Sequence, residues 1–92
     1  MDAKKIEKEE IVHLHFLPND VLKNDEQRRD RGQKLIYAAA IGNTEKHKCK
    51  IVFNSQEGDN YVETTIWAVT DKYLCLKGGI LLLITSIIEV VL

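Results

Sequence analysis

The sequence predicts an α+β fold, in which an N-terminal helix packs on a small five-stranded, strongly bent antiparallel sheet that curls into a barrel. Three observations predict it. Residues 46–92 form short runs of β-branched and aromatic residues, and breaks rich in Gly, Asn and Asp separate them, which is typical of strands and turns. Residues 19–41 have the capping signals and apolar spacing of one helix. Residues 1–10 are largely charged, and residues 11–17 show a short alternation of apolar and other residues.

Length and composition limit the classes of protein that fit this chain. The 92 residues carry a formal net charge of -1, and 45% of them are hydrophobic. A chain of this size makes one core, so we expect residues 19–92 to form a single helix-plus-barrel domain. The small net charge argues against general attraction to nucleic acid or to an anionic membrane. The longest weakly charged stretch, residues 78–88, is shorter than the roughly 20 residues of a spanning helix. We therefore expect a cytoplasmic bacterial protein that does not enter the membrane.

Residues 1–18 are expected to form a flexible or extended N-terminal arm. The stretch from Ile11 to Leu17 alternates between apolar and other side chains, which predicts an extra edge strand. The same stretch would also fit one or two helical turns. Pro18 ends either arrangement, because it biases the preceding residue toward an extended backbone.

The helix expected over residues 19–41 has signals at both ends. Asn24 is suited to cap its N-terminus, and Gly42 and Asn43 supply a left-handed stop. Its buried stripe comprises Leu35, Ile36, Ala38 and Ala39. The small alanine side chains predict that the helix lies close against the sheet.

The strands can be paired by assuming a register. If Asn54 lies opposite Tyr61, the first two strands form one hairpin. A two-residue turn at Gly78 and Gly79 pairs Leu76 with Leu81. A turn at Asp71-Lys72 pairs Val69 with Leu74 and Trp67 with Leu76, and Thr85-Ser86 is expected to make a 3₁₀ corner.

This register makes the strands after residue 60 apolar on both faces. One face carries Trp67, Val69, Leu74, Leu76, Leu81 and Leu83, and the other carries Ile66, Ala68, Cys75 and Leu82. A sheet that is apolar on both faces needs cover on both, which the curl of the sheet and the helix would supply. The alternative is one bare face, which would imply a partner. Cys49 and Cys75 lie two strands apart in this register, so we expect free, buried thiols.

The order of one helix and five short bent strands resembles the Sm-like fold and small SH3-like barrels in general. Leu76-Lys77-Gly78-Gly79-Ile80 is similar to the hydrophobic–basic–Gly signature between the last two Sm strands. The order is also similar to the Rho-binding antitermination family, and the whole chain resembles short bacterial proteins without an assigned function. The loop at residues 70–73 lacks the Asn of the Sm pattern. Lys77 is therefore the one Sm-type RNA-contacting position that the resemblance implies.

Two sets of residues suggest ligand chemistry. Lys46, Lys48 and Lys50 alternate along one expected strand beside Trp67, which suits phosphate contact and base stacking. The competing interpretation is a solvated edge strand protected by its lysines, with Trp67 buried under the helix. His13 and His15 would share one face of an extended segment, where zinc could bind. Surface histidines explain that pair more simply, so we expect neither a metal nor another cofactor.

No nucleophile, base and orienting group lie together in the sequence, and we expect no enzyme. The sequence favours a non-catalytic binding, adaptor or regulatory domain of unknown partner, either a protein or an RNA. The alternative is an Sm-like or antitermination-type RNA-binding protein that uses Lys46, Lys48, Lys50, Trp67 and Lys77. Pairing of the weakly charged C-terminal edge strand with a second copy can also give a homo-oligomer.

Overall fold

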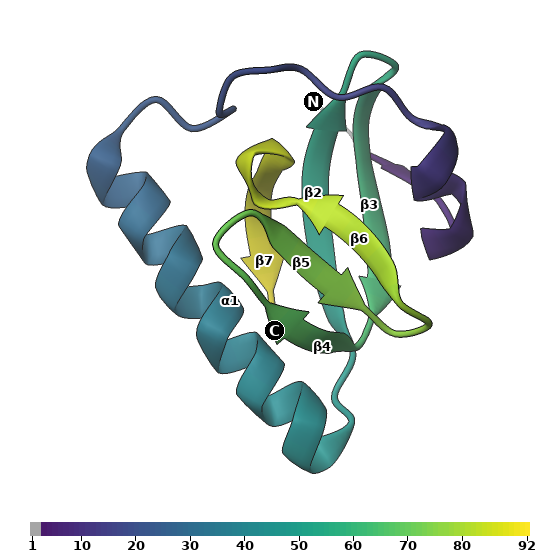
Figure 1. Cartoon of the computed structure of the whole chain (residues 1–92), viewed down its shortest axis with the longest axis vertical. Coiled ribbons are helices and arrows are strands. Elements are labelled where there is room, and N and C mark those ends of the chain that lie inside the picture. The colour runs from purple at the N-terminus through teal and green to yellow at the C-terminus, as the bar shows by residue number, and fades with distance from the viewer. Residues whose placement is uncertain (1–2) are drawn as a thin grey trace.

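The computed structural model describes residues 3–92 (Figure 1). Within them lie one α-helix, seven strands and two 3₁₀ helices. The helices are η1 (Lys8–His13), α1 (Asp25–Glu45) and η2 (Ile84–Ser86). The strands are β1 (Lys4–Lys5), β2 (Cys49–Ser55), β3 (Gly58–Thr64), β4 (Ile66–Val69), β5 (Tyr73–Leu76), β6 (Ile80–Leu83) and β7 (Ile87–Val91). The α+β class and the 3₁₀ corner near Thr85 are confirmed.

The strands form two sheets instead of the predicted five-stranded barrel. One sheet has the order β1-β3-β2-β7 and the other has the order β4-β5-β6. No pairing closes the strands of residues 3–92 into a barrel, so that part of the prediction is wrong. The division falls at Thr65, where the strand expected over residues 61–70 breaks between β3 and β4. The carbonyl group of Thr65 accepts a hydrogen bond from the Lys77 N–H (3.0 Å), and the chain passes there from one sheet to the other.

The core lies between the two sheets, and two helices close its open sides. α1 packs against the edge strands β4 and β7, whereas η1 packs against β6 and β3 (Figure 1). The largest fully buried side chains are Phe53, Leu35, Ile51, Ile66, Leu74, Leu76, Leu82, Ile87, Val62 and Val90. Leu35 is the member of this set that α1 supplies. Ile36, which the sequence placed in the buried stripe of the helix, is 65% exposed, so that part of the prediction is wrong. The helix therefore closes one side of a sandwich and does not cover the outer face of either sheet.

α1 begins at Asp25 and not at residue 19, so the expected range is wrong at its start, but Asn24 caps the helix as predicted. The side-chain oxygen of Asn24 accepts hydrogen bonds from the backbone N–H groups of Glu26 (2.7 Å) and Gln27 (3.2 Å). These bonds satisfy two of the N–H groups that have no partner inside a helix.

The end of α1 lies beyond the predicted stop at Gly42 and Asn43. The chain leaves the helix at Lys46, which adopts the left-handed conformation with φ 53°, and its N–H group donates to the Gly42 carbonyl. Gly42 serves packing instead. A Cβ atom at this position would lie 2.6 Å from the Ile66 carbonyl oxygen and 3.2 Å from Thr65 Cγ2. The missing side chain lets α1 approach the backbone of β4.

The β2–β3 hairpin pairs two residues away from the expected register. Asn54 lies opposite Asp59 and not Tyr61. The chain turns at residues 56–57, and Gly58 follows with φ 121°, so the connection is shorter than the sequence suggested. Because the shift is an even number of residues, each side chain stays on its expected face, and alternate residues of β2 are buried.

The β4–β5 pair contains a bulge. Val69 pairs with Leu74 as predicted, but the register shifts between Ile66 and Ala68. Trp67 is the extra residue of this bulge, so the expected Trp67–Leu76 pair does not form. The extra residue opposite β5 changes which side chains of β4 face the core.

The β5–β6 hairpin is shifted by one residue. Leu76 pairs with Ile80 and not with Leu81, because Lys77 joins the two glycines in a three-residue connection. Gly78 and Gly79 have φ values of 88° and 82°, the left-handed conformation that the sequence required there. A shift of one residue turns a strand over. The expected faces of β6 are therefore exchanged.

The N-terminal segment packs on the core. Residues 4–5 pair in parallel with β3, and Ile11 in η1 is buried, so the edge strand predicted over residues 11–17 is wrong. Farther along, the rings of Phe16 and Phe53 have centroids 6.1 Å apart. Residues 3–17 therefore lie along the sandwich as a strap.

A buried ion pair fixes the segment that leads into α1. The Arg31 guanidinium donates to both carboxylate oxygens of Asp20 (2.8 and 2.6 Å) and to the Ile87 carbonyl (3.0 Å). Arg31 is buried, and Asp20 is mostly covered. The bonds to Arg31 hold the pKa of Asp20 below its ordinary value. The pair therefore joins the loop before α1 to the start of β7.

Candidate functional site: the outer face of the β4-β5-β6 sheet

The β4-β5-β6 sheet exposes an outer face that consists entirely of uncharged side chains. Leu74 lies between Val69 and Leu82, and this row faces the core. The next row points the opposite way and joins Ala68, Cys75 and Leu81 across the three strands. We call the outward-pointing set the apolar face: Trp67, Ala68, Tyr73, Cys75, Leu81 and Leu83.

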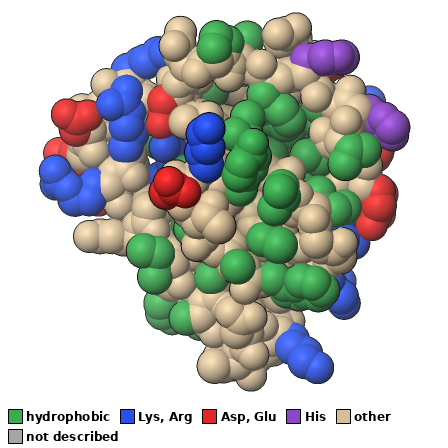
Figure 2. All heavy atoms as spheres, viewed as in Figure 1, with side chains coloured by type: hydrophobic (Ala, Val, Ile, Leu, Met, Phe, Trp, Pro, Cys, Tyr) green, Lys and Arg blue, Asp and Glu red, His purple; other side chains and the backbone are tan. Residues whose placement is uncertain are grey.

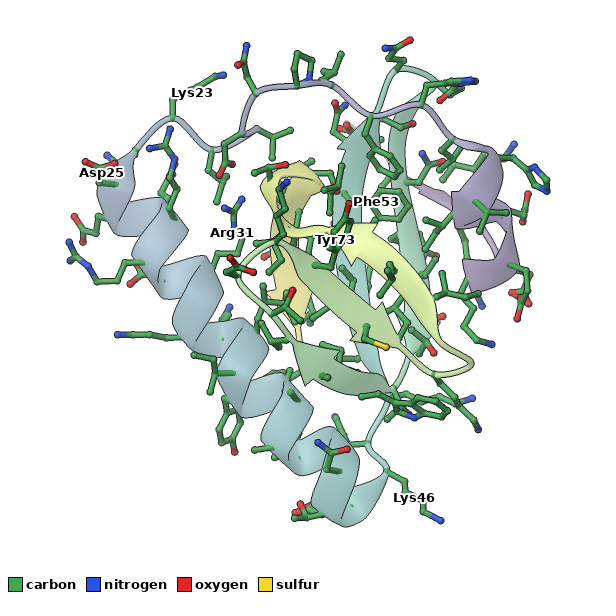
Figure 3. The ribbon with its side chains drawn as sticks, viewed as in Figure 1. Lys23, Asp25, Arg31, Lys46, Phe53 and Tyr73 are labelled. Atoms are coloured by element: carbon green, nitrogen blue, oxygen red, sulfur yellow. The ribbon has the colours of Figure 1, made fainter. Side chains whose placement is uncertain are left out.

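The largest members of the apolar face are well exposed. The exposed fractions are 46% for Trp67, 36% for Tyr73 and 52% for Leu81. Figure 2 shows hydrophobic side chains gathered over β5 and β6, and Figure 3 shows Tyr73 on the near side of the sheet. Charged Asp71, Lys72 and Lys77 occupy the turns at its two ends. The surface thus has an apolar centre and a charged border.

The outer face of the other sheet has a different chemistry. The Lys5 ammonium contacts the Glu63 carboxylate at 3.1 Å, and the amide of Asn54 donates to the Asp59 carboxylate at 2.7 Å. The Lys50 ammonium lies 4.3 Å from the centre of the Tyr61 ring. These partly exposed pairs are typical of a solvated surface. The apolar face has no such pairs, so the two outer faces differ in kind.

The expected double cover of the sheet is therefore incomplete. The sequence placed Trp67 under the helix in one interpretation, but its side chain is exposed. α1 holds the backbone of Trp67, because the Asn43 side chain donates to its carbonyl oxygen (3.2 Å). The inward row is buried by the sandwich, whereas four of the six outward side chains are exposed, which favours the alternative that implies a partner.

The five residues proposed for nucleic-acid contact do not form one strand face. Lys46 caps α1 and Lys48 precedes β2, so Lys50 alone lies within that strand. Trp67 belongs to the other sheet. Lys77 lies in the turn after β5. The predicted arrangement of Lys46, Lys48 and Lys50 along one strand beside Trp67 is therefore wrong. The strand begins only at Cys49, and the chain passes to the other sheet at Thr65.

Lys48 and Lys50 do line a hollow of about 580 Å³ at the end of the β1-β3-β2-β7 sheet. Lys5 joins them there, but Glu7 and Glu63 line the same hollow. The contact with Glu63 raises the pKa of Lys5. Carboxylates beside the ammonium groups offset the positive potential that a phosphate would require.

The two cysteines differ in exposure. Cys49 is buried, and burial raises the pKa of its thiol to about 11. Cys75 is partly exposed on the apolar face, so the prediction of two buried thiols is wrong for it. Both thiols are free, as predicted. They lie in β2 and β5, which belong to different sheets.

The histidines expected on one face lie in different settings. His13 ends η1, whereas the Nδ1 atom of His15 lies 2.7 Å from a carboxylate oxygen of Glu57. Residues 3–92 contain no group of three or more His, Cys, Asp or Glu side chains that could hold a metal ion.

The sequence identified only part of the apolar face. Trp67 was singled out, but Leu81 and Leu83 were assigned to the same face as the buried Leu74. Residues 80–83 are all large and aliphatic, so no alternation in the sequence marks the shift of one residue that turns β6 over. That shift depends on the three-residue turn, which the Gly-Gly dipeptide concealed.

Searches of family models, of curated proteins and of solved structures found no match to this chain. In the part of the chain that the structure describes, no helix has the length and hydropathy to cross a bilayer.

Proposed function

We propose that this protein is a non-catalytic binding module that recognises a protein partner through the apolar face. The observation that carries the proposal is the outer surface of three strands without a charged side chain. A monomeric protein rarely leaves such a surface bare unless it is used for interaction. The polar outer face of the other sheet serves as an internal comparison, because the same chain solvates that surface with ion pairs.

The residue types of the apolar face suit recognition of a protein. Trp67 and Tyr73 are of the kinds that contribute most binding energy at protein interfaces, and Leu81 supplies aliphatic area beside them. The charged turns around them would form the polar rim of an interface. Six side chains make a small centre compared with the roughly 800 Å² per partner of a standard interface. The expected complex therefore extends onto the rim.

Affinity capture with paired variants tests the proposal. Leu81→Lys places a charge in the centre of the apolar face, and Ile36→Lys places the same charge on an exposed position of α1. Ile36 is 65% exposed and lies outside the face. We expect nuclease-treated cell extract to yield the same bound proteins with the wild type and Ile36→Lys, and to lose them with Leu81→Lys.

Thermal unfolding of both variants serves as the control, because each position is exposed and should tolerate lysine. Trp67 is the one tryptophan of the chain, so its fluorescence reports directly on the face. A blue shift on partner binding is expected as the indole leaves water. The proposal would be refuted if Leu81→Lys captured the same proteins as the wild type does.

A second candidate function is RNA binding in the manner of the Sm-like resemblance. The exposed indole of Trp67 favours it, since an accessible aromatic ring can stack on a base. Lys77 and Lys72 would supply phosphate contacts from the ends of the same face. This candidate requires oligonucleotide to quench Trp67 fluorescence at low salt, and the affinity must fall steeply as salt rises. A protein interface would leave the fluorescence unchanged by oligonucleotide.

A further inference from the structure

The strand β7 presents an edge to solvent. It pairs with β2 on one side only, because the strand order places it at the end of its sheet. On the free side, the Ile87 carbonyl accepts from Arg31. Residues 88–91 have no backbone hydrogen bond on that side to any other described residue. At the other sheet edges, β1 is a strand of two residues, α1 packs against β4 and η1 packs against β6.

A groove of about 570 Å³ lies between this free edge and α1. β7 contributes residues 88–90 as one wall. α1 contributes one face, on which Gln27, Asp30, Lys34 and Tyr37 are spaced by one helical turn. Leu22, Tyr37 and Ile88 make apolar parts of the lining. Its volume falls within the range of about 300–1,000 Å³ that is usual for binding sites in proteins.

The charges of the groove are unequal. Arg31 is neutralised by its pair with Asp20. Asp30 on the helix wall and Glu89 on the strand wall have no ion-pair partner among the described residues, and Lys34 opposes them as the single free cation of the lining. The lining therefore has an excess of negative charge, which a basic side chain would complement.

We propose that the groove binds an extended peptide segment of a partner protein, which adds to β7 as a further strand. The free backbone groups of residues 88–91 would supply main-chain hydrogen bonds to it. Strand side chains alternate, so apolar residues at every second position would face the wall formed by Leu22 and Tyr37. A lysine or arginine of the peptide would pair with Asp30 or Glu89. Either a parallel or an antiparallel peptide strand could form hydrogen bonds with the free backbone groups of β7.

A pool of random linear eight-residue peptides displayed on phage is the probe for this site. We expect selection on the wild-type protein to enrich sequences with alternating apolar residues and a basic residue. The enriched peptide is then synthesised, and its affinity is measured by fluorescence anisotropy. Tyr37→Ala, which shortens the groove wall, should weaken binding, whereas Ile36→Ala should not. These neighbouring residues are similarly exposed, at 57% and 65%, but only Tyr37 lines the groove.

Methylation of the peptide's backbone nitrogens separates strand addition from apolar contact alone. Successive N–H groups of a strand point to opposite edges, so one alternate set would face β7 and the other would face away. Methylating the first set should weaken binding by about tenfold or more, since several main-chain hydrogen bonds would be lost together. Methylating the second set should leave binding intact. The proposal would be overturned if methylation of either set left binding equally strong. It would also be overturned if selection on the wild-type protein enriched no sequence more than selection on the Tyr37→Ala protein.

This inference is independent of the apolar face. Leu81→Lys should keep full affinity for the selected peptide, and Tyr37→Ala should keep the proteins captured through the apolar face. Exchange of the β7 amide hydrogens gives a direct readout, since those of residues 88–91 that point away from β2 should become protected when the peptide is bound. Unchanged exchange with a bound peptide would place it elsewhere and refute strand addition.

Discussion

Two glycines of α1 should respond in opposite ways to the same substitution. A Cβ atom at Gly42 would lie 2.6 Å from the Ile66 carbonyl oxygen, whereas a Cβ atom at Gly32 would have nothing within 4 Å. Both positions are inside the helix, where alanine is preferred to glycine by about 1 kcal/mol. We therefore expect Gly32→Ala to stabilise the protein and Gly42→Ala to destabilise it or leave it unchanged.

The magnitude follows from comparing the two variants. The gain in helix propensity is common to both and cancels in the difference. What remains is the overlap at Gly42, which involves a backbone oxygen that cannot rotate away, so α1 and β4 must separate. Overpacking of this kind costs about 1–3 kcal/mol. Gly32→Ala should accordingly exceed Gly42→Ala in free energy of unfolding by about 1–3 kcal/mol.

Urea and thermal unfolding measure this difference. For a domain of this size, 1 kcal/mol corresponds to a change in Tm of about 4–8 °C. Gly32→Ala should raise Tm by about that amount, and Gly42→Ala should not raise it. Urea slopes that are equal for the wild type and both variants would confirm that the folded states are compared directly. If Gly42→Ala stabilises the protein as much as Gly32→Ala, the close approach of α1 to β4 is wrong.

Three further predictions concern single side chains. Asp20→Asn leaves the buried Arg31 without its carboxylate and should cost about 3–5 kcal/mol of unfolding free energy. The bonds to Arg31 lower the pKa of Asp20 from its ordinary value of 3.8. The loss of stability in Asp20→Asn should therefore be fully present above pH 3.8 and should vanish as pH falls through the lowered pKa. A difference in urea stability that persists unchanged at pH 2 would contradict the ion pair. Maleimide should modify Cys75 but not Cys49 in the folded protein, as peptide mass spectrometry would show, because Cys49 is buried with a pKa of about 11. Equal labelling of both would show that Cys49 is accessible. Asn24→Ala should lower stability by about 1 kcal/mol through loss of the cap, and an unchanged Tm would argue against that role.

The sequence carried enough information for the class of fold and for the N-terminal cap of α1. Asn24 caps the helix because its side chain is local to the N–H groups it satisfies, and local signals are readable without the tertiary structure. Gly42 shows where prediction from local sequence signals fails. Its role depends on a carbonyl group 24 residues later in the chain, and the same residue type also ends helices.

The division of the β-strands could not be predicted for a similar reason. The run from residue 61 to residue 70 has strand-like composition throughout, and nothing in it marks Thr65 as the point where the chain changes sheets. The bulge at Trp67 and the three-residue turn after Leu76 each alter the register by one. A shift of one residue exchanges inside for outside, so the faces of β6 were assigned incorrectly although residues 80–83 were predicted as strand.

The hydrogen bond from Arg31 to the Ile87 carbonyl also affects how copies of this protein can associate. An open strand edge is a template on which identical chains can stack into fibres. The guanidinium occupies the first position of this edge, and α1 stands beside the remainder. Because α1 packs against β7, it lies beside the path of a second sandwich, whereas a single extended segment needs less room. The buried arginine and its helix would thus favour a peptide on this edge over the stacking of identical chains.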